Sequence, residues 1–98
     1  MQFVITAYDG ENMLDRRMEV RPRHLANLSA IPGKVVCAGG LLDESGRMKG
    51  SVMILDFGSR EDLDAYLASE PYIAEGVWTD VRVEAMNVVI VNGEKVGK

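Results

Sequence analysis

Hydrophobic and polar residues follow strand-like patterns in four segments of the chain. Each segment is rich in β-branched and aromatic residues and is bounded by glycine, proline or aspartate, as is typical of β-strands. The predicted strands are Gln2–Tyr8, Val35–Leu42, Gly50–Phe57 and Val77–Met86. The polar stretch Asp43–Lys49 between the second and third strands predicts a hairpin loop.

A first helix is predicted between the first two strands. It is expected to begin near Pro22, because proline fits the first turn of a helix, and to stop at Pro32-Gly33. Residues at spacings of three and four give it one apolar face. That face consists of His24, Leu25, Leu28 and Ile31.

A second helix is predicted between the last two strands. Ser59 opens it, and Asp62 at the third helical position serves the amides of the first turn. Its apolar stripe consists of Leu63, Tyr66 and Leu67. Pro71 ends it, and Gly76 ends a short connecting turn.

The resulting order, β-α-β-β-α-β, is the ferredoxin-like α+β arrangement with an antiparallel four-stranded sheet in the order 4-1-3-2. The first and third strands should be central, and they are apolar on both faces, at Phe3–Ile5 and Val52–Leu55. The fourth strand should lie at an edge, and its apolar residues alternate with polar ones. The expected domain spans residues 1–98, with 88–98 as a strand-like extension that ends in the tight-turn pair Asn92-Gly93.

Two helices cover only one face of such a sheet. Apolar area is worth about 25 cal/mol per Å² when it is removed from water, so the second face needs a cover. A second copy of the sheet provides one, and we therefore expect a homodimer, a dimeric α/β barrel with two sheets packed face to face. The C-terminal extension is expected to lie along a sheet edge, its own or the partner's.

Composition and charge exclude several classes of protein. The 98 residues carry a net charge of −4, which argues against nucleic acid and anionic membranes as partners. No apolar run is long enough to span a bilayer, and the first residues lack the features of a signal peptide. The single cysteine, Cys37, excludes an internal disulfide and reads as a small buried hydrophobe. We expect a cytoplasmic domain.

The candidate chemistry centres on the only histidine, His24, which the pattern places in the first turn of the first helix. The alternative is a hydrogen-bonded histidine with only a packing role. Asp9 ends the first strand, beneath the start of that helix, although aspartate before Gly10 is also a common turn residue. A carboxylate beside an imidazole fixes its tautomer and raises its basicity, so a His24–Asp9 pair is a candidate general acid/base.

Three further residues are candidates for binding a substrate. Arg21 can bind an anionic group beside the helix start, although solvated arginines are commoner. Ser51 begins the third strand and faces the proposed pocket. Tyr72, with Trp78, can form a pocket wall, although packing is the commoner role of such aromatic residues.

The segment Arg17–Leu25 resembles the signature of the YciI-like, or YCII-related, family of small dimeric α/β-barrel proteins. Other segments match this family in the same order: Tyr8-Asp9, Ala38–Gly40, Gly50-Ser51 and Pro71–Val77. The resemblance covers about residues 2 to 89. Glu70 departs from it, because the family more often has aspartate before Pro-Tyr.

The resemblance implies a ferredoxin-like homodimer with a histidine–aspartate pair, here His24 and Asp9. One branch of the family removes chloride from chlorinated hydroxyquinols. It thus implies an enzyme of the lyase, isomerase or dehydrochlorinase type, with neither metal nor organic cofactor, acting on a small cyclic or phenolic substrate. His24 would be its general acid/base, oriented by Asp9.

Two alternatives stay open beside this hypothesis. The first is a non-catalytic small-molecule binder or accessory protein that keeps the same pocket. The second is an oxygen-dependent monooxygenase, which the fold alone suggests.

Overall fold

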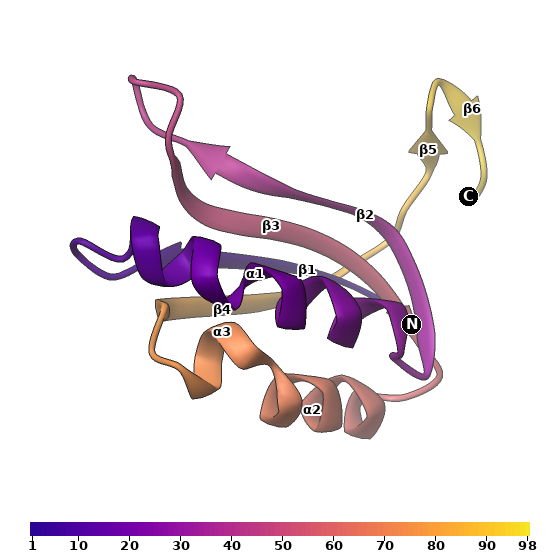
Figure 1. The fold of residues 1–98 in the computed structure, drawn as a ribbon. Helices are drawn as coiled ribbons and strands as arrows, with labels where there is room; N and C mark the ends of the chain where they lie inside the picture. The colour runs from indigo at the N-terminus through magenta and orange to yellow at the C-terminus, as the bar shows by residue number, and fades with distance from the viewer.

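The computed structural model describes residues 1–98 and contains a four-stranded antiparallel sheet (Figure 1). Its strands are β1 (Gln2–Asp9), β2 (Gly33–Leu42), β3 (Met48–Phe57) and β4 (Trp78–Met86). They lie in the order β2-β3-β1-β4, which is the predicted 4-1-3-2 read from the other edge. The ferredoxin-like α+β fold expected from the sequence is therefore confirmed.

The two central strands hold the core together. Ile5 on β1 lies in register with Met53 on β3 and Val83 on β4. Alternate residues of β1 and β3 are buried under the helices, as strand geometry requires. These residues are Phe3, Ile5, Ala7, Met53, Leu55 and Phe57. The residues between them, such as Val4 and Ile54, face the other side of the sheet and are half-buried.

The first helix, α1 (Leu14–Ser29), begins eight residues before the predicted start at Pro22. Pro22 lies inside the helix, so its use as a start signal was wrong. The preceding residues, LDRRMEVR, are good helix formers, and both Pro22 and Met18, four residues earlier, are exposed. The Met18 carbonyl that proline leaves without a helical donor is therefore on the solvent side. Ile31, predicted on the helix face, lies beyond its end.

The second helix, α2 (Arg60–Ser69), begins as predicted. The Ser59 hydroxyl accepts a hydrogen bond from the Asp62 amide at 3.2 Å, which caps the helix. Leu63 and Tyr66 are buried, as the apolar stripe predicted. Pro71 then occupies the first turn of a short third helix, α3 (Pro71–Ala74). The sequence pattern predicts only a connecting turn for this segment.

Ion pairs join α1 to the end of α3. Glu75 accepts hydrogen bonds from both Arg16 and Arg23, the latter at 3.0 Å. These two guanidinium groups lower the pKa of Glu75 below its usual value. The pairs hold α3, and the residues that precede it, beside α1.

The helices leave one face of the sheet open. Cys37 on β2 is exposed there, which contradicts the prediction of a buried residue. Its register partner is Ile54, on the side opposite the helices, and a bulge separates it from Val35. The sequence pattern shows that this strand is apolar, but it does not show that the helices leave this face uncovered.

The C-terminal extension forms a small hairpin of its own, β5 (Ile90–Val91) and β6 (Glu94–Lys95), which projects from the sheet (Figure 1). Its turn at Asn92-Gly93 has positive φ at both residues, as the sequence predicted. The hairpin pairs with no other strand of the chain, so the expected position along its own sheet edge is not found. Val88, before the hairpin, is buried, and its amide donates to the Gln2 side chain at 2.8 Å.

We predict that Pro22→Ala raises the free energy of unfolding by about 1–3 kcal/mol, because alanine restores an amide donor to the Met18 carbonyl and removes the ring clash. Part of this gain is offset because alanine leaves the unfolded chain with more conformational freedom. Urea unfolding followed by circular dichroism measures the change. Equal or lower stability of the variant would show that α1 does not store this strain.

Candidate active site

A buried arginine lies at the start of the site. Arg17 on α1 donates to the Asp9 carboxylate at 2.9 Å and to the Ser51 hydroxyl at 2.7 Å. The side chains of Arg17 and Asp9 are 4% and 5% exposed. The ion pair therefore joins the helix to the end of β1, and the hydrogen bond to Ser51 joins it to β3.

A buried glutamate holds His24, which lies two helical turns after Arg17 on α1. The Nδ1 atom of His24 lies 2.7 Å from Oε1 of Glu70, which is fully buried. Glu70 also accepts from the Tyr66 hydroxyl and, at 3.0 Å, from the Tyr72 amide. Because Nδ1 faces a carboxylate, Nε2 is the ring nitrogen left for a ligand.

The Tyr72 ring contacts both groups. The His24 ring stacks on it with centroids 4.2 Å apart, and the Arg17 guanidinium lies 4.8 Å from its centroid. Trp78 completes the aromatic packing, with its ring edge toward His24 at 5.7 Å between centroids. The hydroxyl of Tyr72 is buried and has no partner in the protein.

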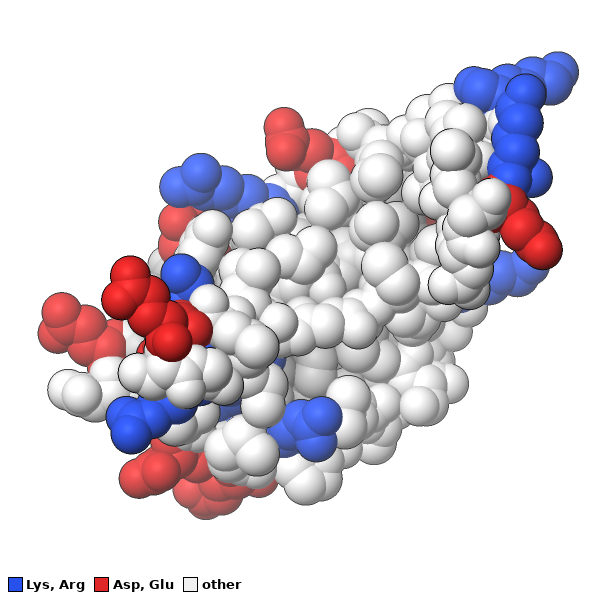
Figure 2. Space-filling view, turned by 90° about the horizontal axis from the view of Figure 1, so that it is seen from above, with Lys and Arg blue, Asp and Glu red and all other residues white.

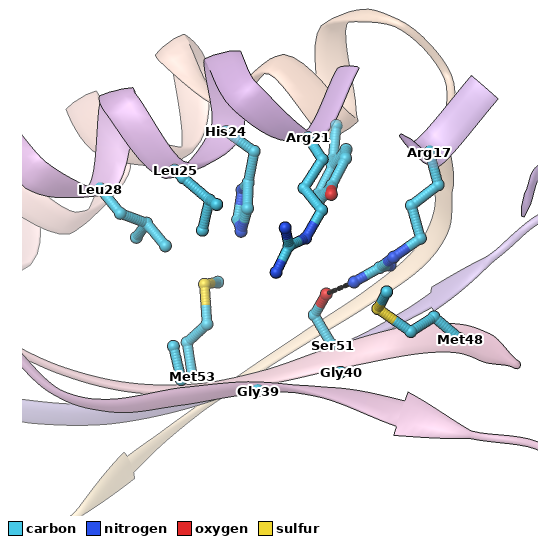
Figure 3. Close-up of a pocket in the computed structure, with 12 residues that line it drawn as sticks. Arg17, Arg21, His24, Leu25, Leu28, Gly39, Gly40, Met48, Ser51 and Met53 are labelled. Carbon is cyan, nitrogen blue, oxygen red and sulfur yellow. Dashed lines mark hydrogen bonds between the residues drawn. The ribbon is translucent and has the colours of Figure 1, made fainter. Parts of the chain in front are cut away.

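These groups meet at a pocket of about 100 Å³ between α1 and the strands β2 and β3 (Figure 3). Figure 3 shows the side chains of Arg21 and His24 pointing from the helix toward Ser51 on the sheet. The pocket is lined by Arg17, Arg21, His24, Leu25, Leu28, Ala38, Gly39, Gly40, Met48, Ser51, Met53 and Tyr72. Its volume suits a small ring or acid, because pockets for larger ligands measure about 300–1,000 Å³.

Local sequence explains how both walls form. Arg17, His24 and Leu28 are seven and four residues apart, so they lie on one face of α1. Glu70 caps α3 by accepting from the Tyr72 amide, a position that directs its carboxylate inward. On β2, the run Ala38–Gly40 has almost no side chain and leaves space opposite the helix.

The expected contact between His24 and Asp9 is not formed. His24 forms a hydrogen bond with Glu70, and Asp9 accepts a hydrogen bond from Arg17. The prediction was wrong about these partners because it began the helix at Pro22. With the helix beginning at Leu14, the residue that faces the end of β1 is Arg17.

Arg21, Ser51 and Tyr72, the predicted binding residues, all line the pocket with His24. Two further residues were missed as functional: Arg17 and Glu70. The seven-residue spacing from Arg17 to His24 was a usable signal for the first. In the sequence, Glu70 is only a departure from the family pattern. In the structure, it is the carboxylate that holds the histidine.

Burial governs the ionisable groups around the pocket. It raises the pKa of Asp9, and the neighbouring Arg17 opposes that effect without cancelling it. Burial also raises the pKa of Tyr72. For Tyr66, burial and then the nearby Glu70 carboxylate raise the pKa far above its usual value, so the phenol stays protonated and donates to Glu70.

Metal ligands do not gather anywhere in the structure: no group of three or more histidine, cysteine, aspartate or glutamate side chains is placed to hold an ion. No helix is long and apolar enough to cross a membrane.

Comparison with protein families matches residues 1–87 to the YCII-related domain. The chain belongs to the YCII-related family. The resemblance found in the sequence is thus confirmed, and residues 88–98 lie outside the match. Protein YciI of Escherichia coli is 34% identical over 97 residues, which cover 91% of this chain and 99% of the relative. Aspercryptin biosynthesis cluster protein B of Emericella nidulans is 34% identical over 86 residues, which cover 79% of this chain and 55% of the relative.

Solved structures share the fold of this YCII-related chain. The 5-chloro-2-hydroxyhydroquinone dehydrochlorinase TftG from Burkholderia phenoliruptrix, in complex with 2,5-dihydroxybenzoquinone, superposes with a TM-score of 0.80 and 24% identity, covering 89% of this chain and 94% of TftG. An antibiotic biosynthesis monooxygenase superposes with a TM-score of 0.61 and 15% identity, covering 91% and 98%. At these identities the likeness concerns the fold alone.

We predict that the raised pKa of Tyr66 makes the protein less stable in alkali. The phenol ionises near pH 10 only in the unfolded chain, so the stability that it contributes is complete below pH 10 and declines above it. The decline amounts to about 1.4 kcal/mol per pH unit. Tyr66→Phe is expected to cost about 1.5–3 kcal/mol at pH 7, because the hydroxyl donates to a buried carboxylate, and to remove this part of the slope.

Urea unfolding of the wild-type protein and of Tyr66→Phe between pH 8 and pH 11 measures both effects. The same slope in the two proteins would show that Tyr66 ionises in the folded state.

Proposed function

We propose that this YCII-related protein is an enzyme that transfers protons on a small cyclic or phenolic substrate, with His24 as general acid/base. The observation that carries the proposal is the hydrogen bond between His24 Nδ1 and the buried Glu70 carboxylate. The imidazole ring of His24 also lines the pocket. A proton on Nδ1 shared with a carboxylate leaves the lone pair of Nε2 free to accept a proton. Glu70 is thus the positioning carboxylate, in place of Asp9.

The arginines supply the second requirement of such a reaction. Removing a proton from a phenol or an enol leaves negative charge on oxygen, and preorganised cations and hydrogen-bond donors stabilise that charge. Arg17 is held in place by Asp9, and Arg21 lines the same pocket with no ion pair of its own. Ser51 and Tyr72 add hydroxyl groups. In this proposal Asp9 positions Arg17. The substrate is contacted by Arg21, Ser51 and Tyr72.

Dehydrochlorination is one reaction that this arrangement supports, and TftG, which shares the fold, is a dehydrochlorinase. In a chlorinated hydroquinone, removal of a hydroxyl proton forms a carbonyl while the ring carbon that bears chlorine takes up a proton. Loss of a second hydroxyl proton then expels chloride with the electron pair of the carbon–chlorine bond. The net loss is one proton and one chloride, so the step needs no external oxidant, and a group that alternates between base and acid suffices.

Two probes test the proposal. Chloride release is measured with 5-chloro-2-hydroxyhydroquinone, and exchange of the ring protons of 2,5-dihydroxybenzoquinone is followed by NMR in deuterated water. Wild-type protein is expected to accelerate at least one process, and His24→Gln to slow it by about 10²–10⁴-fold. Glu70→Gln is expected to slow it less and to change the tautomer of His24, read from the nitrogen shifts of its ring. Asp9→Asn is the matched control, because it should leave that tautomer unchanged.

The alternative, a non-catalytic binding protein, has its own result in these experiments. In that case the probes shift the resonances of the single histidine, but neither process is accelerated and His24→Gln changes nothing. Probes that shift no resonance and undergo no reaction would remove the pocket as the functional site.

We also propose that the protein is a homodimer that buries the open face of the sheet. Half-buried apolar residues such as Val4, Val52 and Ile54 lie there without cover from the helices. From the side on which the C-terminal hairpin projects, Figure 2 shows charged residues toward the two ends and a broad uncharged area between them. Sheet packing of this kind buries such surfaces. Small molecules and a second copy are the proposed partners, and the cytoplasm is the proposed location.

Light scattering at micromolar concentration is expected to give twice the chain mass of 10.8 kDa. Val52→Arg places a charge on the open face and should reduce the mass to that of one chain. Met18→Arg, which changes a 46% exposed residue on α1, is the control and should leave the dimer intact. A folded wild-type protein with the mass of one chain would contradict this assembly.

A further inference from the structure

A second hollow adjoins the pocket, between the C-terminal half of α1 and the edge strand β2. It measures about 560 Å³ and is lined by Leu25, Leu28, Ser29, Gly33, Val35 and Ala38. Three of these residues, Leu25, Leu28 and Ala38, also line the pocket that contains His24. The two hollows therefore share a wall, and we call the second one the β2 groove.

The β2 groove exists because the helices do not extend over the edge strand. Val35 and Ala38 are exposed, although their register partners on β3, Leu55 and Met53, are fully or almost fully buried. Ala38, which lines both hollows, carries only a methyl group. The floor from Ala38 to Gly33 extends over about 16 Å of strand.

The two hollows differ in chemistry. The pocket presents Arg17, Arg21 and His24 at one end. The β2 groove has no charged lining residue, and Leu25 and Val35, which are 44% and 40% exposed, offer apolar surface on both of its walls. A ligand that occupies both must therefore be polar at one end and apolar at the other.

We propose that the natural substrate is amphipathic: a hydroxylated or acidic ring in the pocket carries an alkyl or aryl substituent that lies along the β2 groove. This inference rests on the function proposed above, because His24 and Arg21 are taken to bind the polar end. The pocket of about 100 Å³ is small for a complete substrate, and the wall that it shares with the groove supports this occupant over a separate protein partner. The groove lies on the helix side of the sheet, so dimerisation through the open face leaves it accessible.

A series of 4-alkylphenols from methyl to hexyl tests the proposal, with affinity measured by calorimetry and site occupancy by the resonances of His24. Wild-type affinity is expected to rise about two- to threefold for each added methylene, somewhat less than the roughly fourfold gain of full burial. Val35→Ser, which changes a residue that lines the groove alone, should flatten this increase while 4-methylphenol binds as before. Ala38→Leu, which fills space at the wall shared by the two hollows, should flatten the increase as well.

The chain offers a matched control next to Val35. Val36 lines a different hollow, with Cys37 and Ile54 on the open face beneath the C-terminal segment. Val36→Ser makes the same chemical change on the same strand, and it should preserve the wild-type increase with chain length.

Each other outcome overturns the inference in a recognisable way. If affinity does not change with chain length while every phenol still shifts the His24 resonances, the amphipathic substrate is wrong but the acid/base function stands. An equal increase in all four proteins would place the alkyl chain elsewhere. A change of mass in Val35→Ser would identify a second copy as the occupant of the groove. Phenols that shift no His24 resonance at any length would remove the polar end as well, and with it the proposed function.

Discussion

The buried carboxylate of Glu70 is the constraint on which the site depends. A carboxylate with no exposed surface is costly by several kcal/mol unless donors surround it. Glu70 has three, from three separate elements: the His24 ring on α1, the Tyr66 hydroxyl on α2 and the Tyr72 amide on α3. The three elements must therefore meet in one arrangement, and that arrangement fixes the orientation of the imidazole.

A second buried pair, Asp9 with Arg17, also contacts the Tyr72 ring and acts in the same manner. It ties the first turn of α1 to β1, and through Ser51 to β3. One pair thus orients the His24 imidazole, which is the proton-transfer group of the proposed function, and the other orients the Arg17 guanidinium. Because each anion is matched to a partner within the protein, Arg21 is left as the cation of the pocket that a substrate can neutralise.

The sequence predicted the sheet well because strand order depends on periodic patterns within short segments. The double-sided apolar character of β1 and β3 marked them as central, and Ser59 marked the start of α2. The site was predicted only in part. Its members His24, Arg21, Ser51 and Tyr72 were named, but the partner of the histidine was not.

That partner was missed for a physical reason. Glu70 lies 46 residues from His24, and its direction depends on how α3 begins after α2, which no local pattern specifies. The helix start was misplaced because proline is usually a stronger signal than a run of good helix formers. Cys37 was called buried because an apolar strand gives no information on which of its faces the same chain covers.

The position of the β2 groove on an edge strand separates the proposed binding surface from the residues that keep the protein folded. Gly33, Val35 and Ala38 contribute little to the core, whose buried residues lie on the other strands and on the helices. Under the proposed function, substitutions at Val35 and Ala38 can therefore change the shape of the ligand that fits, while the His24–Glu70 pair and the core stay the same. Gly33 is different, because a Cβ there would lie 2.3 Å from the backbone oxygen of Asp56. Such a layout allows members of one family to diverge in substrate through one accessible strand, without passing through unstable intermediates.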